Sequence, residues 1–129
     1  MTLAERLKQR QAGGSPIMEG RTQIETIELF EVNRLTLEAV DILISRTSGL
    51  PFAVVTFKEL PTGFYFGGQV LTDIVFAIYE ELGYTIHDPE TGELKVGKPL
   101  VVSDENIVLE AERKHSDKSG RNYTSFTIL

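Results

Sequence analysis

Cysteine is absent from the 129 residues, and histidine occurs only twice. Without cysteine the chain forms no disulfide framework, no thiolate nucleophile and no cysteine-based zinc or iron–sulfur site. No apolar run reaches the length that spans a membrane, and the opening MTLAERLKQRQAGGSP lacks the apolar middle of a signal peptide. We therefore expect an intracellular protein of the cytoplasm.

Candidates for acid–base catalysis and metal binding are equally scarce. His87 and His115 both fall in predicted loops, outside any recognisable catalytic arrangement. The segment HDPE at residues 87–90 matches no established spacing of metal ligands and is better explained as a turn. The glycine pair at 67–68 lacks the P-loop Lys-Ser/Thr and the Rossmann spacing. We predict no enzymatic activity, no catalytic residues, no cofactor and no metal site; a pocket lined by converging polar side chains would revive the enzyme alternative.

Negative charge is in excess, with a formal net charge of −6, but it is unevenly spread. Residues 1–21 hold four basic residues against two acidic ones, a net charge of +2, and residues 113–121 (RKHSDKSGR) hold four against one, a net charge of +3. Residues 22–112 therefore carry −11. The distribution of charge bears on nucleic-acid binding more than the sum does. Each basic cluster also fits a solvated tail or loop.

With 41% apolar and 25% charged side chains, the chain has the length and composition of one folded domain. The opening LAERLKQRQ can form a short helix, which the GGSP at residues 13–16 would end. We predict a flexible basic arm over residues 1–22, followed by a single domain over residues 23–129.

Hydrophobic periodicity predicts three strands, one helix and two further strands in this domain. Residues 69–82 (QVLTDIVFAIYEEL) carry an apolar stripe at three- and four-residue spacing, which is typical of a helix, and Gly83 is its expected stop. The first strand is expected to be long and bent. The predicted strands cover residues 26–45, 52–60, 64–66, 106–114 and 121–129.

This order of elements is that of the OB fold, a five-stranded Greek-key barrel with one helix between strands 3 and 4. A small α+β sandwich with the helix across one face has the same order and stays an alternative. In OB folds, ligands lie on the face of strands 2 and 3. The loops that join strands 1 and 2 and strands 4 and 5 flank that face.

Three consecutive rings lie on the third predicted strand. Phe64 and Phe66 share one face and are expected in the core, while Tyr65 takes the other face. Phe52 and Lys58 share the outward face of the preceding strand. Rings beside basic loops suit single-stranded nucleic acid, because unpaired bases expose π faces and each nucleotide adds a phosphate charge. The candidate nucleic-acid-binding residues are Arg46, Phe52, Lys58, Tyr65, Arg113, Lys114, Lys118, Arg121 and Tyr123.

The stretch PFAVVTFKELPTGFYFGGQVLTDIV and the terminal SGRNYTSFTIL resemble small phage single-stranded DNA-binding proteins of the OB class. The resemblance covers residues 30–129 approximately, and its motifs are VVTFKE, the FYFGG turn into a helix, and a basic hairpin ending in a tyrosine-containing strand. It implies binding of single-stranded DNA in phage replication or recombination, contacts with other replication or recombination proteins, and a homodimer. Bacterial members of the wider class recruit partners through an acidic C-terminal tail; here residues 127–129 fall in a predicted strand, so we do not expect that mode.

A second functional class stays open, because each of these features has an ordinary structural explanation. A tyrosine on a strand surface follows from β propensity or cross-strand pairing alone, and a basic hairpin tip is often merely solvated. The acidic balance of residues 22–112 favours a protein-binding adaptor or an inhibitor of a host factor. RNA in place of DNA is also compatible with the pattern.

Overall fold

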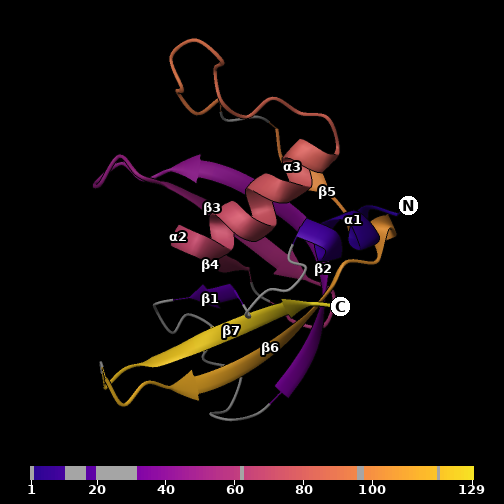
Figure 1. The fold of residues 1–129 in the computed structure, drawn as a ribbon, viewed down its shortest axis with the longest axis vertical. Helices are drawn as coiled ribbons and strands as arrows, with labels where there is room; N and C mark the ends of the chain where they lie inside the picture. The colour runs from indigo at the N-terminus through magenta and orange to yellow at the C-terminus, as the bar shows by residue number, and fades with distance from the viewer. Residues whose placement is uncertain (1, 11–16, 20–31, 62, 96–97, 119) are drawn as a thin grey trace.

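The computed structural model describes residues 2–10, 17–19, 32–61, 63–95, 98–118 and 120–129, and of residues 17–19 it describes the backbone alone. Among these residues, six strands form an antiparallel sheet in the order β1-β7-β6-β2-β3-β4, and β5 pairs with β2 beside this path (Figure 1). The strands are β1 (Ile17–Glu19), β2 (Val32–Ile44), β3 (Pro51–Phe57), β4 (Phe64–Phe66), β5 (Leu100–Val101), β6 (Val108–His115) and β7 (Asn122–Ile128).

The first predicted strand is long and bent, as expected. The N-terminal part of β2 pairs with β6 through residues 32–36, and the remainder pairs with β3, with a register shift between Leu37 and Ala39. Such an irregularity bends a strand and increases its twist. One strand therefore belongs to both halves of the sheet. The first residues of the prediction, 26–31, lie outside the described residues.

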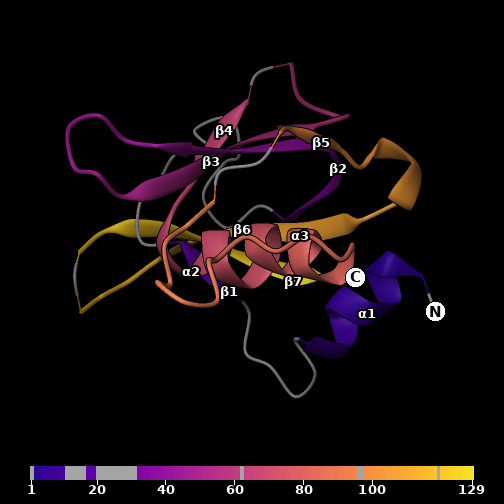
Figure 2. The ribbon, with the colours of Figure 1, turned by 90° about the horizontal axis from the view of Figure 1, so that it is seen from above.

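The predicted helix is confirmed between β4 and β6. It runs from α2 (Gly68–Val70) through a π-helical segment (Leu71–Phe76) into α3 (Ala77–Glu81). Gly83 follows with φ +90°, a left-handed conformation that glycine adopts without a steric penalty, and its N–H donates to the Glu80 carbonyl at 3.0 Å. The helix lies in the angle between the β2-β3-β4 part of the sheet and the β6-β7 part (Figures 1 and 2).

Alternation along the strands places the side chains as predicted. On β3, the side chains of Ala53, Val55 and Phe57 are buried, and on β4 those of Phe64 and Phe66 are buried. These residues face the helix, whose Ile74, Val75 and Ile78 are also fully buried, and Phe126 of β7 completes the core from the other half of the sheet. The rings of Phe66 and Phe126 lie 5.1 Å apart between centroids. Side chains therefore join the two halves.

A closed five-stranded barrel would need a ladder between β4 and β7. Within the described residues there is none, since β4 pairs with β3 alone and β7 pairs with β6 and β1. The β-rich class and the helix between strands match the prediction, and the closed five-stranded barrel is not confirmed. The sheet of the described residues is open between β1 and β4.

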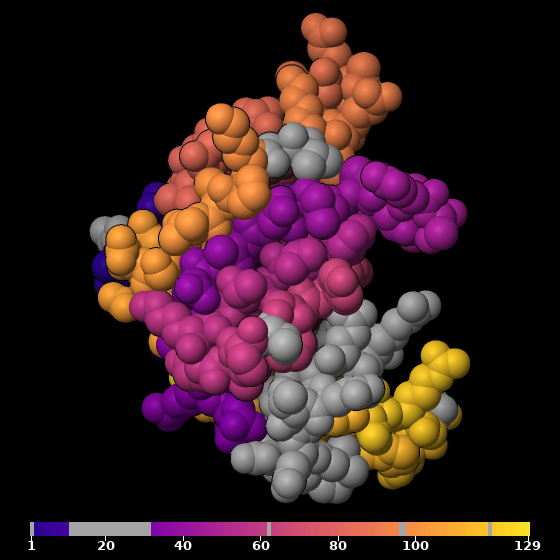
Figure 3. Space-filling view, turned by 180° about the vertical axis from the view of Figure 1, so that it is seen from behind, coloured from indigo at the N-terminus to yellow at the C-terminus, as the bar shows by residue number. Residues whose placement is uncertain are grey.

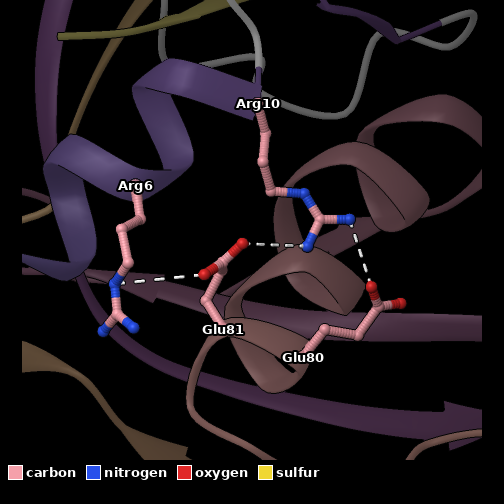
Figure 4. Close-up of polar contacts among 4 residues, drawn as sticks. All are labelled: Arg6, Arg10, Glu80 and Glu81. Atoms are coloured by element: carbon pink, nitrogen blue, oxygen red, sulfur yellow. Dashed lines mark hydrogen bonds and ion pairs between the residues drawn. The ribbon is translucent and has the colours of Figure 1, made fainter.

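Two pieces of the segment predicted to be a flexible arm pack on the domain instead. The helix α1 (Leu3–Arg10) buries Leu3 and Leu7, and its Arg10 lies 3.1 Å from Glu80 and 3.4 Å from Glu81 at the end of α3 (Figure 4). The strand β1 pairs with β7. Burial of the two leucines explains the docking, since an amphipathic helix gains stability by covering apolar surface. The predicted helix stop at 13–16 lies outside the described residues.

Candidate nucleic-acid interface

Two aromatic rings lie together on the outer face of β3 and β4, which we call the ring surface. Phe52 and Tyr65 make an edge-to-face contact, with centroids 5.6 Å apart and planes at 72°. Tyr65 is 56% exposed and stands opposite Val54 in the ladder. Its neighbours Phe64 and Phe66 point into the core, so alternation forces the tyrosine outward. The prediction of an exposed Tyr65 is confirmed.

A shallow cavity of about 380 Å³ adjoins the ring surface at the β2–β3 turn. The turn is closed by the Ser45 N–H donating to the Leu50 carbonyl at 2.9 Å, and Gly49 allows it with φ +71°. Leu50 is 65% exposed at the cavity rim. The lining residues are Ser45, Ser48, Leu50, Pro51, Phe52 and Tyr65.

Three residues of this turn that line the cavity were not among the predicted site residues: Ser45, Ser48 and Leu50. Sequence reasoning treats RTSG as a turn signal and looks there for cations. The sequence does offer one indication of this surface, the leucine at position 50. An apolar residue next to a polar turn either packs on the core or stays exposed, and an exposed one can form part of a binding surface. Here it stays on the surface beside the rings.

The basic tip of the β6–β7 hairpin projects from the same side of the molecule as the β2–β3 turn. Its turn is closed by the Ser116 N–H donating to the Arg121 carbonyl at 2.9 Å, and both Lys118 and Arg121 are exposed. Figures 1 and 2 show both turns pointing the same way, and the space-filling view shows them projecting at the same edge of the molecule (Figure 3). The two turns that correspond to the predicted flanking loops therefore project to the same side of the molecule.

The hairpin strands divide the remaining predicted residues between two faces. Arg113 follows Leu109 and Ala111 on the face that packs inward, and His115 comes next on that face, with its Nδ1 2.8 Å from the Asn122 Oδ1. Lys114 and Tyr123 are paired in the ladder and lie on the opposite face. The Lys114 Nζ is 3.3 Å from the Glu112 Oε2. The fold therefore separates Lys114 and Tyr123 from Arg113.

The two cations predicted near the strands differ in their positions. Arg46 is exposed in the β2–β3 turn, next to Ser45 of the cavity. Lys58 follows the far end of β3, and its Nζ donates to the Ser103 carbonyl at 2.8 Å. Six residues of extended chain place its Cα roughly 20 Å from that of Phe52. Arg46 therefore adjoins the ring surface and Lys58 does not.

One carboxylate shares the face of the rings. Asp41 of β2 stands opposite Val54 of β3, which itself stands opposite Tyr65. A negative charge at this place repels anions, so the positive potential near the rings is confined to the β2–β3 turn.

The described residues also bear on metal binding and on membrane insertion. They contain no group of three or more His, Cys, Asp or Glu side chains that could hold a metal ion. None of their helices combines the length and apolar character that crossing a membrane requires.

No protein-family model, no curated protein and no solved structure matches this chain.

Proposed function

We propose that this protein binds single-stranded DNA with little sequence preference, and that it is not an enzyme. The observation that carries the proposal is the exposed Tyr65 in contact with the half-buried Phe52, beside a β2–β3 turn that points the same way as the basic β6–β7 tip. Base stacking on an exposed ring is worth roughly 1–3 kcal/mol per base, and it tolerates any sequence because every base has a π face.

The roles follow from position. Tyr65 and Phe52 stack on bases, while Leu50 gives an apolar edge to the same surface. Arg46 at one turn and Lys118 and Arg121 at the other contact phosphates. These are the two loops that flank the ligand in OB folds, and the order β7-β6-β2-β3-β4 with the helix between β4 and β6 supports an OB-type domain.

The decisive experiment is a titration of fluorescent oligo-dT at about 50 and about 200 mM salt. We expect affinity to fall as salt rises, because each phosphate contact releases counterions, and we expect duplex DNA to bind far less well. Tyr65→Ala should weaken oligo-dT binding by roughly tenfold. Val101→Ala is the control, since Val101 is 76% exposed on β5 but lies outside the ring surface.

A protein-binding adaptor is the second candidate. The acidic balance of residues 22–112 and the exposed Leu43, Ile44 and Leu50 on the β2–β3 hairpin favour it. Under this alternative oligo-dT does not bind even at low salt. A role in phage replication or recombination, and a homodimer, belong to the proposal; sedimentation equilibrium tests the dimer, and binding to RNA oligomers tests the preference for DNA.

A further inference from the structure

A second cavity, of about 350 Å³, lies between the end of α3 and the segments that follow it. It shares no lining residue with the cavity at the ring surface. We call it the Tyr84 pocket. Its main lining residues are Tyr79, Tyr84, Ile86, Lys95, Lys98 and Leu100.

Backbone and side-chain hydrogen bonds hold the walls of the Tyr84 pocket in place. The Tyr84 N–H donates to the Tyr79 carbonyl at 3.0 Å, and the Lys95 N–H donates to the Ile86 carbonyl at 2.6 Å. The Tyr79 hydroxyl donates to the Lys98 carbonyl at 3.1 Å. Burial, assisted by the negative charge of Asp41, raises the pKa of Tyr79, so this hydroxyl keeps its proton.

The pocket combines an apolar wall with positive charge. The rings of Tyr79 and Tyr84 meet edge to face at 5.9 Å, and much of the Tyr84 ring remains open to solvent. Lys95 and Lys98 supply two ammonium groups, and the lining residues that the structure describes include no carboxylate. Asp88 lies 4.0 Å from Lys95 and partly offsets that charge. Among the described residues Lys98 has no ion-pair partner.

We propose that the Tyr84 pocket binds one nucleoside monophosphate, with the base against the Tyr84 ring and the phosphate at Lys98 and Lys95. The volume lies at the lower end of the range of small-ligand pockets, roughly 300–1,000 Å³, which suits one nucleotide. An inorganic anion would leave the tyrosine wall uncovered. An uncharged ring would leave the Lys98 ammonium group without a counter-charge.

The test is a titration of the ¹⁵N-labelled full chain with AMP, followed by amide chemical shifts. We expect shifts at Tyr84, Ile86 and Lys98 that saturate in the millimolar range. Adenosine and inorganic phosphate, tested separately, should each bind about tenfold more weakly than AMP. Adenosine contacts only the tyrosine wall, and inorganic phosphate contacts only the lysines. Tyr84→Ala and Lys98→Ala should each weaken AMP binding to a similar degree, while Tyr65→Ala leaves it unchanged.

Three results would overturn the assignment: no shift up to about 10 mM AMP, AMP binding that Tyr65→Ala abolishes, or inorganic phosphate that binds as well as AMP. The last result would indicate an anion site alone. Tyr65 and Tyr84 are both exposed, so their substitution by alanine removes no core packing. The amide spectrum verifies the fold of each variant. Binding of oligo-dT reports on the ring surface, so retention of either activity without the other separates the two sites.

Discussion

The carboxylate of Glu59 ties the end of β3 to the bend of β2. It accepts hydrogen bonds from the Thr36 N–H at 2.6 Å and from the Thr36 hydroxyl at 2.7 Å. Burial alone would raise its pKa, but these two bonds and the charge of Lys58 outweigh it and lower the pKa of Glu59 below its ordinary value. The stabilisation is therefore full above the pKa of the unfolded chain, and it is lost as pH falls through the lowered folded-state pKa.

We expect Glu59→Gln to reduce the free energy of unfolding at pH 7 by about 0.5 kcal/mol, because an amide offers Thr36 only one acceptor and the site is exposed. The difference from the wild type should shrink as pH falls below the ordinary glutamate pKa, because the Glu59 carboxylate takes up its proton as pH passes through its lowered folded-state pKa. Urea unfolding at pH 7 and at pH 3 measures it, with Glu90→Gln as the control at an exposed turn. An equal loss of stability at both pH values would contradict the charge-based explanation.

For a single residue, the sequence predicts the face of the strand on which its side chain lies better than it predicts the groups that this side chain contacts. Period-two alternation was sufficient to put Tyr65 outside and Phe64 and Phe66 inside, because one buried face fixes the register of a strand. It could not show that the Lys58 ammonium reaches the carbonyl of Ser103, a residue 45 positions away. Only the fold brings such groups together, so a cation adjacent to a binding strand can be engaged elsewhere.

The β6–β7 hairpin is the element on which the proposed function can be refined. Arg113 lies on the face that continues to Ala111 and Phe126, and Phe126 contacts Phe66 of β4. That face turns toward the core side of β3 and β4, away from the ring surface. Lys118 lies instead at the exposed tip of the hairpin, whereas Lys114 lies in β6 with its Nζ 3.3 Å from the Glu112 Oε2.

We therefore expect Lys118→Gln to weaken oligo-dT binding by roughly three- to tenfold and to reduce the salt dependence by about one phosphate contact. Lys114→Gln makes the same change in charge on a strand of the same hairpin and should have a smaller effect, since its ammonium group lies beside the Glu112 carboxylate. Fluorescence anisotropy at several salt concentrations compares the two. Equal losses would show that only net charge matters, and a larger loss for Lys114→Gln would place the DNA along the strand β6 instead of at the tip.

Among the elements, those with clear periodicity were predictable, and those defined by pairing were not. The apolar stripe predicted the helix of residues 68–81, and the run of β-branched residues predicted the long strand β2. The short strands β1 and β5 have three and two residues, too few to establish a period. They exist because a neighbouring edge, on β7 or β2, offers unpaired backbone groups.

At the scale of the whole molecule, the sequence led to a domain with a loose basic arm, and the structure incorporates part of that arm. Arg6 and Arg10 suggested a solvated tail, whereas in the structure both lie against the acidic end of α3 at Glu80 and Glu81 (Figure 4). Exposed pairs of this kind contribute about 0–1 kcal/mol. The larger contribution comes from Leu3 and Leu7, 2% and 1% exposed.

The docking of α1 is directly testable through Leu7→Ala. If α1 is part of the core, this change removes buried apolar atoms and leaves a cavity, so the free energy of unfolding should fall by roughly 2–4 kcal/mol. Lys8→Ala, in the same helix turn but exposed, should stay within about 0.5 kcal/mol of the wild type. Urea unfolding followed by circular dichroism measures both, and a single transition in each would indicate that helix and sheet unfold together. If Leu7→Ala proved as stable as Lys8→Ala, α1 would be a free arm in solution. Its arginines would then be available to a phosphate backbone.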